Sequence, residues 1–128
     1  RDVAGLVSAA LNDLGKPIRG SRILVVGVAY KPDIDDTRES PSLDVMNLLS
    51  RQGGEVRWYD PHVGDLHESV AAERESGFDA DVLASYDVAV IVTNHRDVDY
   101  ELLVDACPAI VDTRNALRGV ASDKITRL

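Results

Sequence analysis

Short apolar runs separated by polar segments dominate this sequence. Residues 23–26 (ILVV) and 88–92 (VAVIV) are apolar and mostly β-branched, a pattern typical of parallel strands that are buried on both faces. Residues 55–59 alternate between apolar and polar side chains, and residues 109–111 form another apolar run. The pattern predicts four strands, and residues 124–128 are compatible with an additional edge strand.

Helical periodicity fills the intervals between these runs. Apolar residues at helical spacing predict a helix over residues 2–14, ended by Gly15, and a second one that begins at Pro41 with Ser40 as its N-cap. Shorter helices are expected over residues 81–85 and 100–106, whereas residues 63–80 are expected to form a loop with at most one short element. Strands that alternate with helices predict an α/β fold with a three-layer, doubly wound parallel sheet.

Composition narrows the functional classes. At 128 residues the chain is expected to form one domain, and its formal net charge of −8 argues against a surface for nucleic acid or anionic membranes. The sequence contains neither an apolar run of membrane-spanning length nor a signal-peptide pattern. The single cysteine, Cys107, excludes an internal disulfide and fits a reducing compartment, so we expect a soluble cytoplasmic domain.

Polar residues follow each predicted strand at the point where it ends. They are Tyr30 and Lys31, then Asp60 and His62, then Thr93 and His95, and finally Asp112 and Arg114. Because parallel strands end at the same edge of a sheet, we expect a ligand crevice there.

Lys31 and Arg114 are the cations expected to bind an anionic ligand such as a diphosphate. The alternative remains open that Lys31 is solvated and that Arg114 pairs with Asp112 or Asp36.

Other chemistries are less well supported by the residues. Residues 33–37 match the DxDxT pattern of haloacid-dehalogenase phosphatases, but three residues separate this pattern from Gly27-Val28-Ala29, whereas the attacking aspartate should follow the strand directly. Gly27 permits a sharp turn or a close approach, but a dinucleotide site requires a G-x-G-x-x-G that opens a helix. No spacing supports a metal site or gives His62, His67 or His95 a partner.

Two further expectations concern structure rather than chemistry. Asp36, Arg38 and Glu39 are expected to hold their own loop in place through local hydrogen bonds. Cys107, which precedes Pro108, is expected to be a half-buried structural cysteine and not a nucleophile.

Three blocks of sequence also resemble a known family. Residues 27–33 (GVAYKPD), 36–41 (DTRESP) and 59–61 (YDP) are similar, in this order, to the C-terminal domain of the UDP-glucose/GDP-mannose (nucleotide-sugar) 6-dehydrogenases. The form of the first and third blocks is closer to the branch that acts on UDP-N-acetylhexosamines. The resemblance implies a Rossmann-like domain over residues 20–128, preceded over residues 1–19 by the end of an interdomain helix.

The resemblance also implies a function. The parent enzyme would use NAD to oxidise the C6 alcohol of a UDP-sugar to a carboxylate, and Tyr30, Lys31 and Arg114 of this chain would contact the UDP part of the substrate. The NAD-binding domain and the catalytic cysteine and lysine would lie outside this chain, so it would contain no catalytic residue and be inactive alone. The chain is expected to be monomeric and the parent a homo-oligomer. The alternative is a non-catalytic Rossmann-like module that binds or senses another nucleotide.

Overall fold

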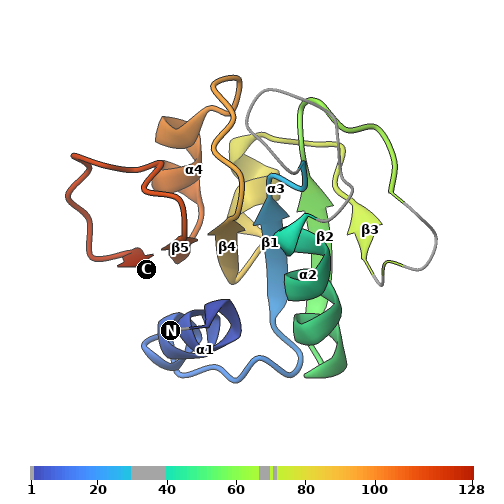
Figure 1. Cartoon of the computed structure of the whole chain (residues 1–128). Helices are drawn as coiled ribbons and strands as arrows, with labels where there is room; N and C mark the ends of the chain where they lie inside the picture. The colour runs from blue at the N-terminus through green and yellow to red at the C-terminus, as the bar shows by residue number, and fades with distance from the viewer. Residues whose placement is uncertain (1, 30–39, 67–69, 71) are drawn as a thin grey trace.

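A parallel β-sheet forms the centre of the molecule. The computed structural model describes residues 2–29, 40–66, 70 and 72–128. Within these residues the sheet has six strands in the order β3-β2-β1-β4-β5-β6, and every neighbouring pair is parallel (Figure 1). The strands are β1 (Arg22–Val26), β2 (Glu55–Tyr59), β3 (Glu73–Arg74), β4 (Val88–Ile91), β5 (Ile110–Asp112) and β6 (Ile125–Arg127).

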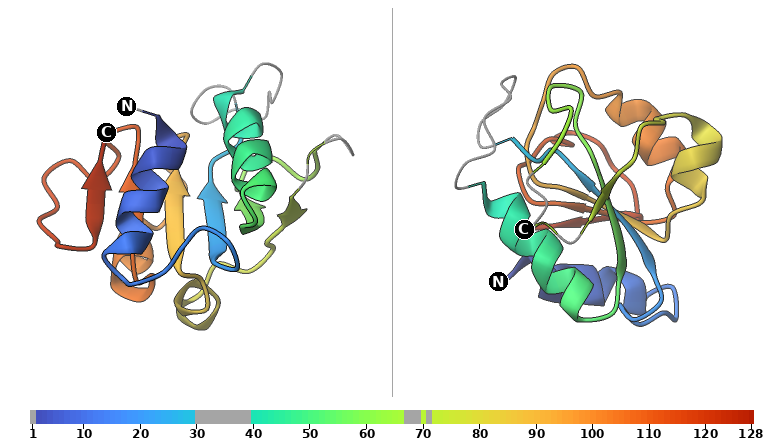
Figure 2. Two further views of the ribbon diagram at one scale, coloured as in Figure 1. Left: turned by 90° about the horizontal axis from the view of Figure 1, so that it is seen from below. Right: turned by 90° about the vertical axis from the view of Figure 1, so that its right-hand side faces the viewer.

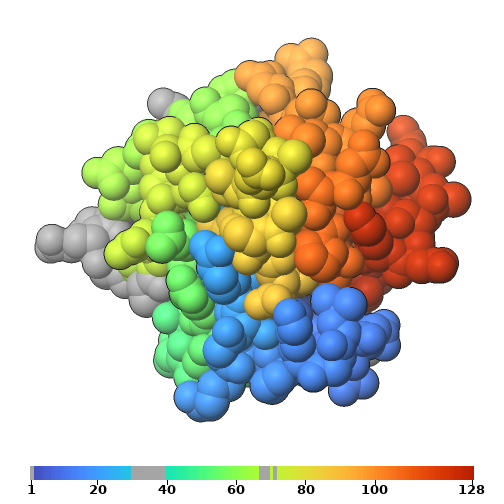
Figure 3. Space-filling view, turned by 180° about the vertical axis from the view of Figure 1, so that it is seen from behind, coloured from blue at the N-terminus to red at the C-terminus, as the bar shows by residue number. Residues whose placement is uncertain are grey.

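Helices cover both faces of this sheet. The helices α1 (Val3–Asn12) and α2 (Pro41–Arg51) lie on one face, and α3 (Ala80–Ala84) and α4 (Tyr100–Ala106) lie on the other (Figure 2). Figure 3 shows the molecule from the second side, where α3 in yellow and α4 in orange form much of the surface. The expected three-layer, doubly wound α/β fold is confirmed.

Alternating side chains of the central strands supply a separate core to each face. Ile23 and Val25 of β1 pack with α1 and α2, whereas Leu24 and Val26 pack with α3 and α4, and all four side chains are fully buried. This two-sided burial explains why the strand is a continuous apolar run in the sequence.

Each described helix begins at a capping side chain. Ser40 accepts a hydrogen bond from the N–H of Ser42 and Pro41 occupies the first helical position, as the sequence predicted for α2. Asp2, Asp79 and Asp99 accept hydrogen bonds in the same way at the starts of α1, α3 and α4.

The edges of the sheet hold the elements that the sequence indicated least clearly. β6 confirms the additional edge strand, and β3 lies within the segment expected to be a loop with at most one short element. Among the helices that the structure describes, none combines the length and the apolar character that crossing a membrane requires.

Candidate functional site

The carboxyl ends of β1, β2 and β4 are joined by one buried carboxylate. Asp60 follows β2 directly and is 1% exposed. Its Oδ2 accepts hydrogen bonds from the N–H groups of Val28 (2.8 Å) and Ala29 (3.1 Å), just beyond β1. Its Oδ1 accepts from the N–H of His62 at 2.8 Å. The expected convergence of polar groups at this edge of the sheet is therefore present.

His95 forms a further hydrogen bond with this carboxylate. Its side chain is fully buried, and Nε2 lies 2.7 Å from Asp60 Oδ2, where it donates to the carboxylate oxygen. The ring of His62 lies 4.7 Å from that of His95, centroid to centroid, and His62 Nε2 is 3.2 Å from Asp97 Oδ2. The sequence indicated no partner for either histidine, and the structure gives one to His95, whereas His62 Nε2 makes no hydrogen bond within the described residues. Residues on either side of β1 meet only once the strand order places β2 and β4 beside it.

Side chains also hold the carbonyl groups of the two residues beyond β1. Ser42 Oγ donates to the Val28 carbonyl oxygen at 3.1 Å, and Thr93 Oγ1 donates to the Ala29 carbonyl oxygen at 2.7 Å. Together with the bonds to Asp60, every main-chain polar group of Val28 and Ala29 is engaged by a side chain from another element. The chain therefore leaves β1 in a fixed direction.

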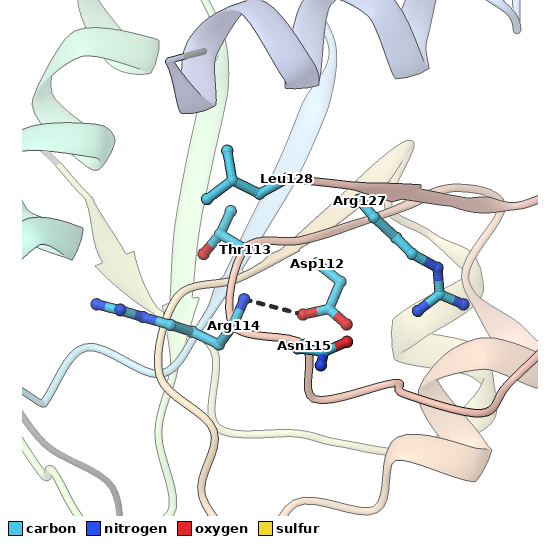
Figure 4. A pocket seen from close by; sticks show the side chains of 6 residues that line it. All are labelled: Asp112, Thr113, Arg114, Asn115, Arg127 and Leu128. Carbon is cyan, nitrogen blue, oxygen red and sulfur yellow. Dashed lines mark hydrogen bonds between the residues drawn. The ribbon is translucent and has the colours of Figure 1, made fainter.

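Arg114 lies at the same edge of the sheet, after β5. Its side chain is exposed, and its Nε donates to the Val92 carbonyl oxygen at 2.8 Å. Figure 4 shows the side chain extending away from the Asp112 carboxylate. That carboxylate accepts from the main-chain N–H groups of Arg114 (3.1 Å), Ala116 (3.1 Å) and Leu117 (2.8 Å). Asp112 thus shapes the turn after β5, and the guanidinium is oriented by Val92 instead.

A cavity of about 550 Å³ opens beside Arg114 at the ends of β5 and β6 (Figure 4). Its lining residues are Asp112, Thr113, Arg114, Asn115, Arg127 and Leu128. The guanidinium of Arg127 donates hydrogen bonds to the carbonyl oxygens of Leu117 and Val120, so it stabilises the backbone of the loop before β6. Both arginines are exposed, and they differ in that the Arg127 guanidinium bonds to main-chain carbonyls of the loop before β6, whereas Arg114 bonds to Val92 through Nε.

The remaining sequence-predicted residues divide into two groups. Tyr30 and Lys31 lie outside the described residues, as do the loop side chains Asp36, Arg38 and Glu39, the 33–37 phosphatase-like pattern and His67. Cys107 is described, and it is fully buried rather than half-buried, at the C-terminal end of α4. Burial raises the pKa of its thiol to about 11, so the prediction that it is not a nucleophile is supported by a physical cause.

The described residues do not fit a dinucleotide or a metal ion. A pyrophosphate of that kind binds where a glycine-rich turn leads from a strand directly into a helix. Here β1 ends at Val26, α2 begins at Pro41, and the side chain of Ser40 already caps that helix. The described residues also contain no group of three His, Cys, Asp or Glu side chains placed to bind a metal.

Comparison with known proteins identifies the family. Residues 24–119 match the model of the UDP-glucose/GDP-mannose dehydrogenase family, UDP binding domain. The chain is 34% identical over 113 residues to a UDP-glucose 6-dehydrogenase of Rhizobium meliloti, covering 81% of this chain and 25% of the relative. It is 32% identical over 120 residues to a UDP-N-acetyl-D-mannosamine dehydrogenase of Pyrococcus horikoshii, covering 90% of this chain and 27% of the relative.

Solved structures agree with this result. The UDP-D-ManNAc dehydrogenase from Pyrococcus horikoshii superposes with a TM-score of 0.75 at 30% identity, over 97% of this chain and 29% of that one. The chain thus spans about a quarter of the length of the curated relatives it matches. With three quarters of its sequence matched by one family model and its fold shared with solved members, this chain belongs to the UDP-glucose/GDP-mannose dehydrogenase family, as a UDP-binding domain.

Proposed function

We propose that this chain binds the UDP part of a UDP-sugar within an NAD-dependent dehydrogenase that oxidises the sugar C6 alcohol to a carboxylate. The match of residues 24–119 to the UDP-binding domain of the family carries this proposal. The names of the relatives, which include UDP-glucose and UDP-N-acetyl-D-mannosamine dehydrogenases, support a UDP-sugar substrate. Such an enzyme would act in the cytoplasm as a homo-oligomer.

Within this domain we assign substrate contact to Tyr30, Lys31 and Arg114. The geometry of Arg114 supports its share of the assignment, because the hydrogen bond from Nε to Val92 orients the guanidinium while the side chain stays exposed. The two terminal nitrogens of an arginine held in this way form a fork that fits two oxygens of a phosphate.

Other parts of the parent would supply the chemistry. NAD would bind to another domain, because the sequence that follows β1 lacks the G-x-G-x-x-G of a dinucleotide site. No catalytic residue is assigned to this chain, and we expect it to be inactive alone. In this scheme residues 1–19 are the end of an interdomain helix and residues 20–128 are the UDP-binding domain, which would be monomeric when isolated.

The parent enzyme provides the direct test of this function. Purified parent, incubated with NAD and either UDP-glucose or UDP-N-acetyl-D-mannosamine, should form NADH and the corresponding uronate. The isolated chain at equal concentration should form neither product. If the parent oxidises no UDP-sugar while the chain still binds a nucleotide, the alternative of a non-catalytic nucleotide-binding or regulatory module would be favoured.

A further inference from the structure

We propose that Asp60 and His95 position the nucleotide site without touching the ligand, by fixing the backbone of Val28 and Ala29 relative to Arg114. This inference rests on the proposed function, because it concerns the same site. The proposal gives a role in ligand binding to a buried pair that is not itself expected to contact UDP.

The Asp60 carboxylate bonds to groups at the ends of neighbouring strands. Asp60 follows β2. Its carboxylate accepts hydrogen bonds from the N–H groups of two residues beyond β1 and from Nε2 of His95, which lies beyond β4. In the sheet β1 lies between β2 and β4, so one side chain joins the ends of three neighbouring strands. Val28 and Ala29 directly precede Tyr30 in the sequence.

Disturbing this buried arrangement would cost stability. Asp60 is 1% exposed and His95 is fully buried, so neither can exchange its partner for water. A buried carboxylate is tolerated only when its oxygens are fully hydrogen-bonded, and removing one partner leaves an uncompensated polar group. The conformation of Val28 and Ala29 and the position of His95 therefore depend on one another.

The residues that follow β4 connect this pair to Arg114. Val92 and Thr93 are consecutive residues at the end of β4: the carbonyl oxygen of Val92 accepts from Arg114 Nε, and the hydroxyl of Thr93 donates to the Ala29 carbonyl oxygen. The same two residues thus hold both Arg114 and Ala29, which lie on the two sides of the proposed site. His95 follows two residues later, and its bond to Asp60 closes the connection back to Val28 and Ala29. Sites of this kind bind well only when such supporting contacts hold their geometry to a fraction of an ångström.

A partly buried hydrogen bond outside the candidate site provides the comparison. Tyr86, which precedes β4 and is 1% exposed, donates from its hydroxyl to Glu75 Oε1 at 2.6 Å. Removing this bond with Tyr86→Phe should destabilise the fold while leaving the ligand edge unchanged. It is therefore a control for loss of stability alone.

The experiment compares the chain with its His95→Leu, His95→Gln and Tyr86→Phe variants. UDP affinity is measured by titration calorimetry, amide hydrogen exchange of Val28 and Ala29 by NMR, and folding by urea denaturation. We expect His95→Leu to weaken UDP binding roughly tenfold, since a small misplacement of binding groups is costly, and to speed exchange of both amides. His95→Gln retains a donor near the position of Nε2 and should recover most of the affinity. Tyr86→Phe should leave affinity and exchange at both amides unchanged.

Two outcomes would overturn the positioning role, and a third would overturn the proposed function. If folded His95→Leu binds UDP as tightly as the unsubstituted chain, the positioning role is overturned. The same conclusion follows if the amides of Val28 and Ala29 exchange no faster in that variant, whatever the affinity for UDP. If the unsubstituted chain binds no UDP while those amides respond as expected, the proposed function of the isolated chain fails and the structural part of the inference stands.

Discussion

Gly27 and Thr93 lie so close together that a β-carbon on Gly27 would be 2.6 Å from the Thr93 carbonyl oxygen and 2.8 Å from its main-chain nitrogen. Gly27 also has a φ of 90°, which L-residues with side chains rarely adopt. The contact brings the ends of β1 and β4 together, where Thr93 then reaches Ala29. The sequence-based expectation that Gly27 permits a close approach is confirmed.

Replacing Gly27 with alanine should therefore destabilise the fold. The substitution combines an unfavourable φ with a clash against main-chain atoms, so we expect a loss of at least about 2 kcal/mol in the free energy of unfolding. Gly119 is the matched control, because it also has a positive φ of 84° but has open space around its missing side chain. Gly119→Ala should cost only about 1 kcal/mol. Equal losses in urea denaturation would contradict the role of the Thr93 contact.

The first helix is predicted to be part of the folding unit. Leu11 of α1 is fully buried in the core shared with α2, whereas Leu14 beyond the helix is 41% exposed. Leu11→Ala should reduce the free energy of unfolding by about 2–5 kcal/mol because it opens a cavity. Leu14→Ala should change it by no more than about 0.5 kcal/mol. A small effect of both substitutions in urea denaturation would mean that α1 does not contribute to the stability of the sheet.

An acid-sensitive contact joins the chain before β1 to the turn before β4. Burial acts to raise the pKa of the Asp87 carboxyl, but hydrogen bonds from Lys16 Nζ at 2.5 Å and from the Arg22 N–H at 2.8 Å outweigh it and lower the pKa below its usual value. The ionised carboxylate therefore stabilises the folded state. This contribution is complete above the ordinary aspartate pKa of about 3.9 and is lost as the pH falls through the lower value of the folded state.

Asp87→Asn should for this reason destabilise the fold in a pH-dependent way. At neutral pH we expect a loss of about 1–2 kcal/mol, since the bonds to a charged acceptor are replaced by weaker ones. The difference from the unsubstituted chain should shrink as the pH is lowered below about 4. Urea denaturation at pH values from neutral down to the acid range measures both. A difference that stays constant with pH would show that ionisation of Asp87 does not stabilise the fold.

The buried cysteine should react slowly. With the thiol pKa raised from 9.0 to about 11, the thiolate fraction at a given pH falls about a hundredfold, and burial adds a barrier to access. Iodoacetamide should therefore modify native Cys107 at least about a hundredfold more slowly than the urea-unfolded chain. Modification of both forms at similar rates would indicate that the thiol is accessible in the folded state.

Local patterns predicted the centre of this fold better than its edges. The apolar runs at 23–26 and 88–92 identified β1 and β4, because strands buried on both faces need apolar side chains at every position. The sequence allowed one short element over residues 63–80 but did not identify β3 as a strand, since Glu73 and Arg74 are exposed and pair only with Arg57 and Trp58 of β2. Its existence depends on a neighbour and not on its own side chains.

In the candidate site, too, local sequence patterns predicted some features, whereas others depend on which strands are neighbours. The sequence indicated which residues follow each strand, and their convergence at one edge was predicted from the parallel arrangement alone. The contact between Asp60 and His95 joins residues 35 positions apart and depends on the order of β2, β1 and β4, which no local pattern contains. The orientation of Arg114 by Val92 likewise depends on β4 and β5 being neighbours.

The most direct test of the central claim is an NMR titration of the chain with UDP, with Arg114→Ala and Arg118→Ala titrated in parallel. Arg118 is also exposed and lies four residues further along, so both substitutions remove the same charge. The account predicts saturable shifts of the amides of Val28, Ala29 and Arg114, and a loss of affinity of roughly tenfold or more in Arg114→Ala, since hydrogen bonds to a charged group are worth about 1.5–3 kcal/mol. Arg118→Ala should bind as the unsubstituted chain does. Saturable binding whose shifts map away from this edge, or equal affinities of the two variants, would contradict it.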